Sequence, residues 1–96
     1  MKVLVTYDIA TTGGNGQKRL NKIAKTCLDY GLRVQNSVFE CDVDSSQWQL
    51  LKNKLLSIYD SENDSLRFYY LGSKWEGKIE HHGAKVILDL KEALIL

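Results

Sequence analysis

Strand-like and helical hydrophobic patterns alternate in one particular order along this 96-residue chain. β-branched, aromatic and apolar residues fill four short segments, which is typical of strands covered by other elements. Two longer segments carry apolar residues at the 3.6-residue period of an amphipathic helix. The predicted strands are 2–9, 33–35, 37–41 and 66–71, and the predicted helices are 17–30 and 45–59. This order predicts an α+β, ferredoxin-like βαββαβ domain whose antiparallel sheet carries both helices on one face.

The limits of these elements can be predicted from single residues. Gly31 is placed to end the first helix. Asp44 is placed to cap the second helix, with Gln47 reaching back to the Asp44 amide. The polar residue Asn36 predicts a tight turn between two short strands, although one kinked strand also fits the pattern. The residues of the two apolar helix stripes are Leu20, Ile23, Ala24, Cys27 and Leu28, then Trp48, Leu51, Leu55 and Ile58.

The length predicts a single domain over residues 1–96, with its core in 1–71 and a C-terminal extension in 72–96. The first and third strands carry apolar side chains on both faces, more than one layer of helices can cover. We therefore expect a homodimer packed through the sheets. Residues 84–90 form a further strand candidate after a glycine-containing linker, and the extension is expected to take part in dimerisation by adding to an edge of the partner's sheet.

Composition excludes several classes of protein. Thirteen basic and 12 acidic residues give a net charge of +1, which provides no global attraction to nucleic acid or membrane. No apolar run is long enough to span a bilayer, and the N-terminus has no features of a signal peptide. The two cysteines are too few for a disulfide scaffold. We therefore expect a cytoplasmic protein with free thiols.

Asp8 is the first candidate for chemistry, because it ends an apolar strand beside a glycine-rich loop. A carboxylate in this position binds a metal, acts as a base or caps the loop, and spacing alone favours the cap. One carboxylate is a poor Mg²⁺ site. In a symmetric dimer, however, two Asp8 carboxylates that face each other across the twofold axis would share one hydrated ion over a phosphodiester.

A local excess of positive charge is the second candidate feature. Residues 17–33 contain five basic side chains against one acidic side chain, an excess of four positive charges. On a helix face opposite the apolar stripe, this excess predicts contact with a phosphate backbone, while a solvated face is the simpler interpretation. The basic residues are Lys18, Arg19, Lys22, Lys25 and Arg33.

Other reactive side chains fit structural roles better. His81 and His82 have no cysteine or acidic residue at ligand spacing, so a solvated turn is expected there. Cys27 and Cys41 fall on buried positions and are expected to be small core residues. Trp48 lies in the apolar register of its helix and is expected in the core.

Four features then occur together: Tyr7-Asp8-Ile9 at the end of the first strand, Arg19, Gly31 and the run RVQNSVFE at 33–40. This combination resembles the CRISPR-associated protein two family, the small nuclease-like subunit of the spacer-acquisition machinery, from Met1 to about Leu71. The resemblance implies a ferredoxin-like homodimer with metal-dependent phosphodiesterase activity on double-stranded DNA or single-stranded RNA. It also implies a bridging role between copies of the CRISPR-associated integrase, protein one.

The resemblance also implies roles for individual residues. Asp8 matches the metal-binding aspartate and Tyr7 is its neighbour in the motif. Arg33 and Phe39 match positions that the family associates with activity, and Arg19 matches a basic residue of the first helix. The loop at 10–16 departs from the family because it lacks the charged residues often found there.

These observations predict a metal-dependent endonuclease of CRISPR spacer acquisition and antiviral defence, with double-stranded DNA favoured and single-stranded RNA as the other substrate. The expected catalytic residues are Asp8, Tyr7, Arg33 and Phe39, with Mg²⁺ or Mn²⁺ shared between the two Asp8 residues of a dimer. The expected nucleic-acid-binding residues are Lys18, Arg19, Lys22 and Arg33. The alternative is a non-catalytic DNA-binding dimeric scaffold that bridges integrase subunits. A ferredoxin-like module that binds a small metabolite is a third interpretation, but it leaves the basic helix and the 35–40 motif unexplained.

Overall fold

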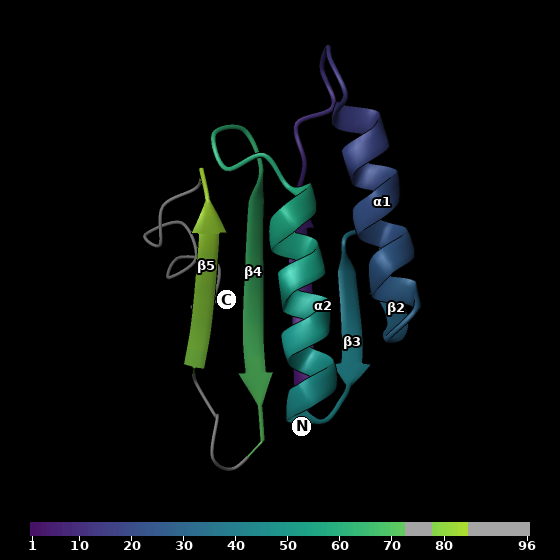
Figure 1. The fold of residues 1–96 in the computed structure, drawn as a ribbon, viewed down its shortest axis with the longest axis vertical. Coiled ribbons are helices and arrows are strands. Elements are labelled where there is room, and N and C mark those ends of the chain that lie inside the picture. The colour runs from purple at the N-terminus through teal and green to yellow at the C-terminus, as the bar shows by residue number, and fades with distance from the viewer. Residues whose placement is uncertain (73–77, 85–96) are drawn as a thin grey trace.

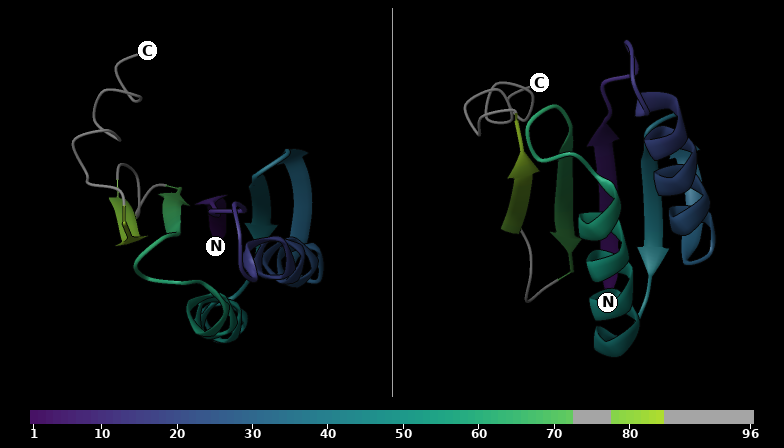
Figure 2. Two further views of the ribbon diagram at one scale, coloured as in Figure 1. Left: turned by 90° about the horizontal axis from the view of Figure 1, so that it is seen from above. Right: turned by 45° about the horizontal axis from the view of Figure 1, so that its top comes forward.

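The computed structural model describes residues 1–72 and 78–84, which form one five-stranded antiparallel sheet and two helices (Figure 1). The strands are arranged in the order β2-β3-β1-β4-β5. Both helices lie on the same side of the sheet (Figure 2, left). The elements are β1 (Lys2–Asp8), α1 (Gly16–Leu28), β2 (Gly31–Gln35), β3 (Val38–Asp42), α2 (Ser45–Ile58), β4 (Ser65–Leu71) and β5 (Lys78–Gly83). The predicted ferredoxin-like α+β fold is confirmed, with an additional strand at one edge.

The core lies between the sheet and the two helices. Side chains along β1 alternate between the two faces, so that Val3, Val5 and Tyr7 are buried against the helices. Leu4 and Thr6 lie on the other face and are half-buried. The two helices and the other strands contribute the rest of this core. Its further buried apolar residues include Ile23, Cys27, Phe39, Cys41, Trp48, Leu51, Leu55, Leu66, Phe68 and Tyr70.

The first helix ends earlier than the sequence predicts. It stops at Leu28, with Asp29 as C-cap, and Gly31 is the first residue of β2 rather than the stop of the helix. Gly31 does not have a positive φ. A Cβ at Gly31 would lie 2.4 Å from the Glu40 carbonyl oxygen, so glycine is needed for close contact between β2 and β3.

The second helix follows the prediction closely. The Asp44 carboxylate accepts a hydrogen bond from the Gln47 N–H at 2.8 Å, and the Gln47 side chain accepts one from the Asp44 N–H at 2.9 Å. This capping box satisfies two backbone donors at the start of α2. Trp48 lies in the core, as expected, and its Nε1 donates to the Tyr70 hydroxyl at 3.1 Å.

Two strands joined by a turn, rather than one kinked strand, follow α1. β2 and β3 pair in antiparallel register from Gly31 opposite Cys41 to Gln35 opposite Val38. The register shifts between Arg33 and Gln35, where the edge strand is irregular.

The strand β5 differs from the sequence prediction. Residues 78–83 pair with β4, whereas the sequence indicated a linker here and a solvated turn at His81 and His82. The two histidines point to opposite faces of the sheet: the Arg67 Nε donates to His81 Nδ1 at 3.0 Å, while His82 Nε2 lies 2.6 Å from a Glu80 carboxylate oxygen. The side chains of this segment are mostly polar, and their pairing with other polar groups allows them to lie in a strand. The segment therefore lacks the apolar alternation by which a strand is recognised in a sequence. The strand predicted at 84–90 lies outside the described residues except for Ala84.

The face of the sheet opposite the helices carries mixed side chains. Leu4, Tyr69 and Ile79 lie in one row across β1, β4 and β5, and all three are half-buried. Leu32, which is opposite Glu40 on β3, is 76% exposed. None of the helices in the described part of the chain is long and apolar enough to cross a membrane.

Candidate functional site

Asp8 ends β1 on the face of the sheet that the helices leave open. Its neighbour Tyr7 is buried under the helices, so alternation along the strand directs the Asp8 side chain to the opposite face. Asp8 is exposed and pairs in register with Ser65 of β4. The chain then turns at once into the loop that leads to α1. A carboxylate is therefore presented at the end of a buried and rigid strand.

The loop after Asp8 is held by Asp64, which lies between the predicted helix 45–59 and the predicted strand 66–71 and has no sequence pattern that singles it out. Asp64 is 0% exposed. Its carboxylate accepts hydrogen bonds from the backbone N–H groups of Ala10 and Asp60, both at 2.9 Å. Arg19 Nε donates to it at 2.8 Å. Burial raises the pKa of Asp64, but the hydrogen bonds from Arg19 and the backbone outweigh burial and lower that pKa below its usual value.

Arg19 thus has a structural partner. Its Nη2 also donates to the Ala10 carbonyl at 3.3 Å, so one guanidinium joins α1, the loop and the segment before β4. This arrangement fixes the backbone two residues after Asp8. The predicted contact between Arg19 and nucleic acid stays a prediction.

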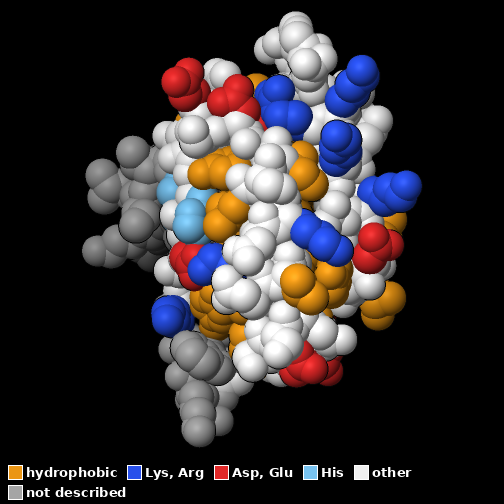
Figure 3. Space-filling view, in the orientation of Figure 1, with side chains coloured by type: hydrophobic (Ala, Val, Ile, Leu, Met, Phe, Trp, Pro, Cys, Tyr) orange, Lys and Arg blue, Asp and Glu red, His pale blue; other side chains and the backbone are white. Residues whose placement is uncertain are grey.

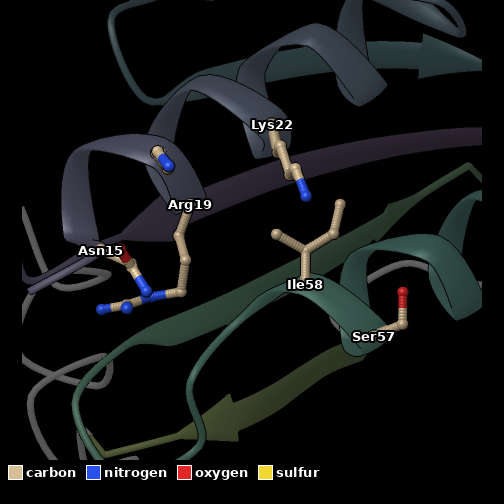
Figure 4. A pocket seen from close by; sticks show the side chains of 6 residues that line it. Asn15, Arg19, Lys22, Ser57 and Ile58 are labelled. Carbon is tan, nitrogen blue, oxygen red and sulfur yellow. The ribbon is translucent and has the colours of Figure 1, made fainter.

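Lys18 and Lys22 lie one turn apart on α1 and are exposed. They line a groove of about 440 Å³ between the start of α1 and the end of α2, together with Asn15, Arg19, Ser57 and Ile58. Lys22 extends from α1 toward Ile58 of α2 (Figure 4). Basic side chains gather on the surface formed by α1 (Figure 3). We call this groove the α1–α2 groove; its charge suits phosphate groups.

The other predicted catalytic residues lie together on the helix side of the sheet. The Tyr7 and Phe39 rings stack with centroids 6.1 Å apart, and the Arg33 guanidinium lies 5.0 Å from the Phe39 centroid. Phe39 is 0% exposed and Tyr7 is 6% exposed. Burial raises the pKa of Tyr7, and its hydroxyl donates to the Asn36 carbonyl at 3.3 Å. The structure therefore brings Tyr7, Phe39 and Arg33 together and places Asp8 on the opposite face.

The described part of a single copy of the chain does not provide a complete donor set for a metal ion. Within residues 1–72 and 78–84 there is no group of three or more His, Cys, Asp or Glu side chains that could hold a metal ion. Asp8 alone provides one carboxylate in an exposed position, which suits a hydrated Mg²⁺ only if further ligands come from elsewhere. A second copy packed on the same face would supply a second Asp8.

The cysteines are core residues, as the sequence predicts. Cys27 and Cys41 are both free and buried. Burial raises the pKa of Cys27 to about 12 and that of Cys41 to about 11. Both thiols are therefore protonated at neutral pH and are not nucleophiles.

Fold and site together define a class: a small ferredoxin-like chain with a carboxylate at the end of its first strand and a basic first helix. The family model described as CRISPR associated protein Cas2 matches residues 1–79. This chain belongs to that family.

Individual relatives extend the similarity over the whole chain. The "CRISPR-associated endoribonuclease Cas2" of Chlorobaculum tepidum is 58% identical over 96 residues, covering 100% of both chains. The "CRISPR-associated endonuclease Cas2" of Halalkalibacterium halodurans is 56% identical and covers 99% of each chain. Among solved structures, the crystal structure of Streptococcus pyogenes Cas2 at pH 6.5 superposes with a TM-score of 0.70 at 53% identity, covering 78% of this chain and 90% of that one.

Proposed function

We propose that this protein is a metal-dependent endonuclease of CRISPR spacer acquisition that hydrolyses phosphodiester bonds at Asp8. The observation that carries the proposal is the exposed Asp8 carboxylate at the end of a buried strand, beside a loop held by Asp64 and Arg19. The names of the relatives, endoribonuclease in one and endonuclease in the other, support nuclease activity. Double-stranded DNA is the favoured substrate and single-stranded RNA the other.

The proposed active form is a homodimer packed through the open faces of the two sheets. The half-buried apolar row of Leu4, Tyr69 and Ile79 supports this, because a second sheet would remove it from water. In that arrangement the two Asp8 carboxylates would hold one Mg²⁺ or Mn²⁺ ion. Such an ion, when bound, polarises the scissile phosphate and lowers the pKa of a coordinated water.

The remaining residues of the chain position the substrate and the carboxylate. Lys18 and Lys22 bind phosphates of the nucleic-acid backbone. Arg33, whose guanidinium lies over the Phe39 ring, also contacts the nucleic acid. Tyr7 and Phe39 contribute as packed rings that hold the strand end and Arg33 in place. Arg19 fixes the loop through Asp64.

The test compares Asp8→Asn with the parent on labelled duplex DNA and single-stranded RNA. Asn has the same shape but does not replace a charged metal ligand. We expect cleavage by the parent with Mg²⁺ or Mn²⁺, and loss of cleavage with EDTA or with Asp8→Asn, when both proteins have the same unfolding temperature and the same mass in solution. Equal cleavage by parent and variant would contradict the proposal.

One observation favours the alternative scaffold function. The α1–α2 groove lies on the helix side, away from the face that Asp8 occupies, so phosphate binding there does not require the carboxylate. A non-catalytic dimer that bridges integrase subunits would bind duplex DNA in the same way in the parent and in Asp8→Asn. It would show no metal-dependent turnover.

We also propose a cytoplasmic location, which the two free thiols support.

A further inference from the structure

A second cavity lies on the other side of α1 from the α1–α2 groove. It has a volume of about 340 Å³ and is bounded by α1, β1 and the turn between β2 and β3. Its lining residues are Tyr7, Leu20, Asn21, Ala24, Arg33, Asn36 and Ser37. We call it the hairpin cavity. It lies at the same end of the sheet as Asp8, since the Tyr7 N–H donates to the Ser37 carbonyl at 3.1 Å.

Arg33 provides a charged group that the fold itself does not use. Its Cζ lies 5.0 Å from the Phe39 ring centroid, and Arg33 is exposed. Among the described residues it forms no salt bridge, in contrast to Arg19, which is bound to Asp64. One face of the guanidinium is fixed by the ring, so the N–H groups at its edge are free to bind a planar ligand.

The rest of the lining is neutral. Asn21 accepts a hydrogen bond from the Gln17 side chain at 3.1 Å through Oδ1, which leaves both of its N–H donors and one oxygen lone pair available. Ser37 and the Tyr7 hydroxyl add further acceptors, and Leu20 and Ala24 form the apolar part of the wall. The hairpin cavity is thus lined by a single cation together with amide, hydroxyl and apolar groups. The α1–α2 groove, in contrast, has three cations along one wall.

This chemistry is that of a nucleobase site rather than a phosphate site. A volume near 340 Å³ is at the small end of the range for ligand pockets, about 300–1,000 Å³, and is sufficient for one base. Arginine pairs through its fork with O6 and N7 of guanine. Amide and hydroxyl oxygens can accept the hydrogen bonds that the N1 and N2 groups of guanine donate.

We propose that the hairpin cavity binds one unpaired nucleobase, with guanine preferred, from a single-stranded nucleic acid. A base has to be unpaired to enter, because in a duplex the N1 and N2 groups of guanine are engaged in the base pair and cannot donate to the amide and hydroxyl oxygens of the cavity. The inference rests on the proposed action on nucleic acid, but not on Asp8. It assigns to Arg33 and Asn21 the selection of the nucleotide that lies next to the strand end.

The experiment measures binding in EDTA, so that cleavage plays no part. Fluorescence anisotropy is recorded with a labelled single strand of uridines and with three strands that carry one central guanosine, adenosine or cytidine. The guanosine strand is expected to bind the parent about tenfold more tightly than the other three. Annealing that strand to its complement is expected to abolish the preference.

Three variants separate the base site from general binding. Arg33→Lys keeps the charge but loses the planar fork, and we expect it to remove the guanosine preference. Asn21→Leu is expected to reduce the preference, and Lys22→Gln to weaken binding to all four strands equally. Their unfolding temperatures establish that the variants are folded.

Equal affinity of the parent for the four strands would overturn the proposal, and so would a preference that survives Arg33→Lys. The Asp8→Asn variant keeps the guanosine preference if the inference is correct, even if the cleavage assay finds no nuclease. Failure of the base site and failure of the proposed function are therefore recognised separately.

Discussion

Tyr7 and Asp8 are consecutive residues of β1, yet their side chains lie on opposite faces of the sheet. Tyr7 is 6% exposed and packs on Phe39, while Asp8 is exposed on the face without helices. The motif that joins them in sequence therefore combines two functions. One residue anchors the strand in the core, and the other presents a carboxylate at the surface.

Substitutions at these two positions should affect different properties: cleavage at Asp8 and stability at Tyr7. We expect Asp8→Asn to reduce metal-dependent cleavage on the order of 100-fold or more with little change in stability. We expect Tyr7→Phe to lose about 1 kcal/mol of stability, since it removes the hydrogen bond to the Asn36 carbonyl, and to cleave within about threefold of the parent. Initial rates and urea unfolding test both. A larger loss of cleavage in Tyr7→Phe than in Asp8→Asn would show that the tyrosine takes part in the reaction.

The α1–α2 groove predicts the salt dependence of binding. Replacing both Lys18 and Lys22 with glutamine removes two cations from one wall of the groove. The slope of log K against log salt for duplex DNA should then become less steep by about 0.9 for each lost phosphate contact. Lys54→Gln on α2 is the matched control, because Lys54 is engaged with the Tyr30 hydroxyl at 3.0 Å. Unchanged slopes in the double variant would place the DNA elsewhere on the protein.

The Arg19–Asp64 pair should contribute to stability more than a surface ion pair does. Arg19→Met leaves the buried Asp64 carboxylate with only its backbone donors, and we expect a loss of about 3 kcal/mol in urea unfolding. The folded-state pKa of Asp64 is lowered, so the pair stabilises the parent above the unfolded pKa of an aspartate. That stabilisation is lost as the pH falls through the folded pKa. A loss of less than about 0.5 kcal/mol at neutral pH would mean that the pair behaves like an exposed one.

Glu80 should make stability depend on pH below about 4.5. Burial raises its pKa, but the Lys52 ammonium at 2.5 Å, His82 and the Tyr70 hydroxyl outweigh burial and lower the pKa to about 2. Since the folded pKa is below the unfolded value, Glu80 stabilises the fold above about pH 4.5, and this contribution disappears as the pH falls toward 2. The contribution is at most about 3 kcal/mol.

The measurement is the unfolding free energy of the parent and of Glu80→Gln between neutral pH and pH values near 2. The two curves should run parallel at neutral pH and converge in acid. Parallel curves over the whole range would rule out a lowered pKa for Glu80. Glu62→Gln serves as the control, because Glu62 is exposed in the loop before β4.

Local patterns in the sequence are sufficient to predict most of the fold. Asp44 and Gln47 predict the start of α2, and the order of elements predicts the ferredoxin-like sheet. Asp8 can be singled out because it ends an apolar strand. The alternation of side chains along a strand could also have indicated that Tyr7 and Asp8 face opposite ways, which the prediction of a joint catalytic set did not take into account.

Other features have no local pattern. Asp64 accepts from Ala10, 54 residues away, so only the folded chain reveals its role. β5 is an edge strand whose polar side chains pair with α2 and β4: Glu80 with Lys52, and His81 with Arg67. Its composition therefore resembles that of a loop, which is why the sequence predicts a solvated turn at the two histidines. Polar residues fill the half-buried positions 80–82 of this edge strand, so the hydrophobic pattern on which the prediction depends is missing.

The contacts of Asp64 do not include the tip of the loop between β1 and α1. Asp64 binds Ala10 on one side of the loop and Arg19 on the other. Gly13 and Gly14 lie between them at the tip of the loop, with φ angles of 74° and 56°. No atom of the described residues lies within 4 Å of a Cβ built at either glycine. The loop projects beyond the sheet at the top of the molecule (Figure 1). A fluorophore or affinity handle inserted between these glycines would be only a few residues from Asp8 in the chain, yet outside the contacts that position it.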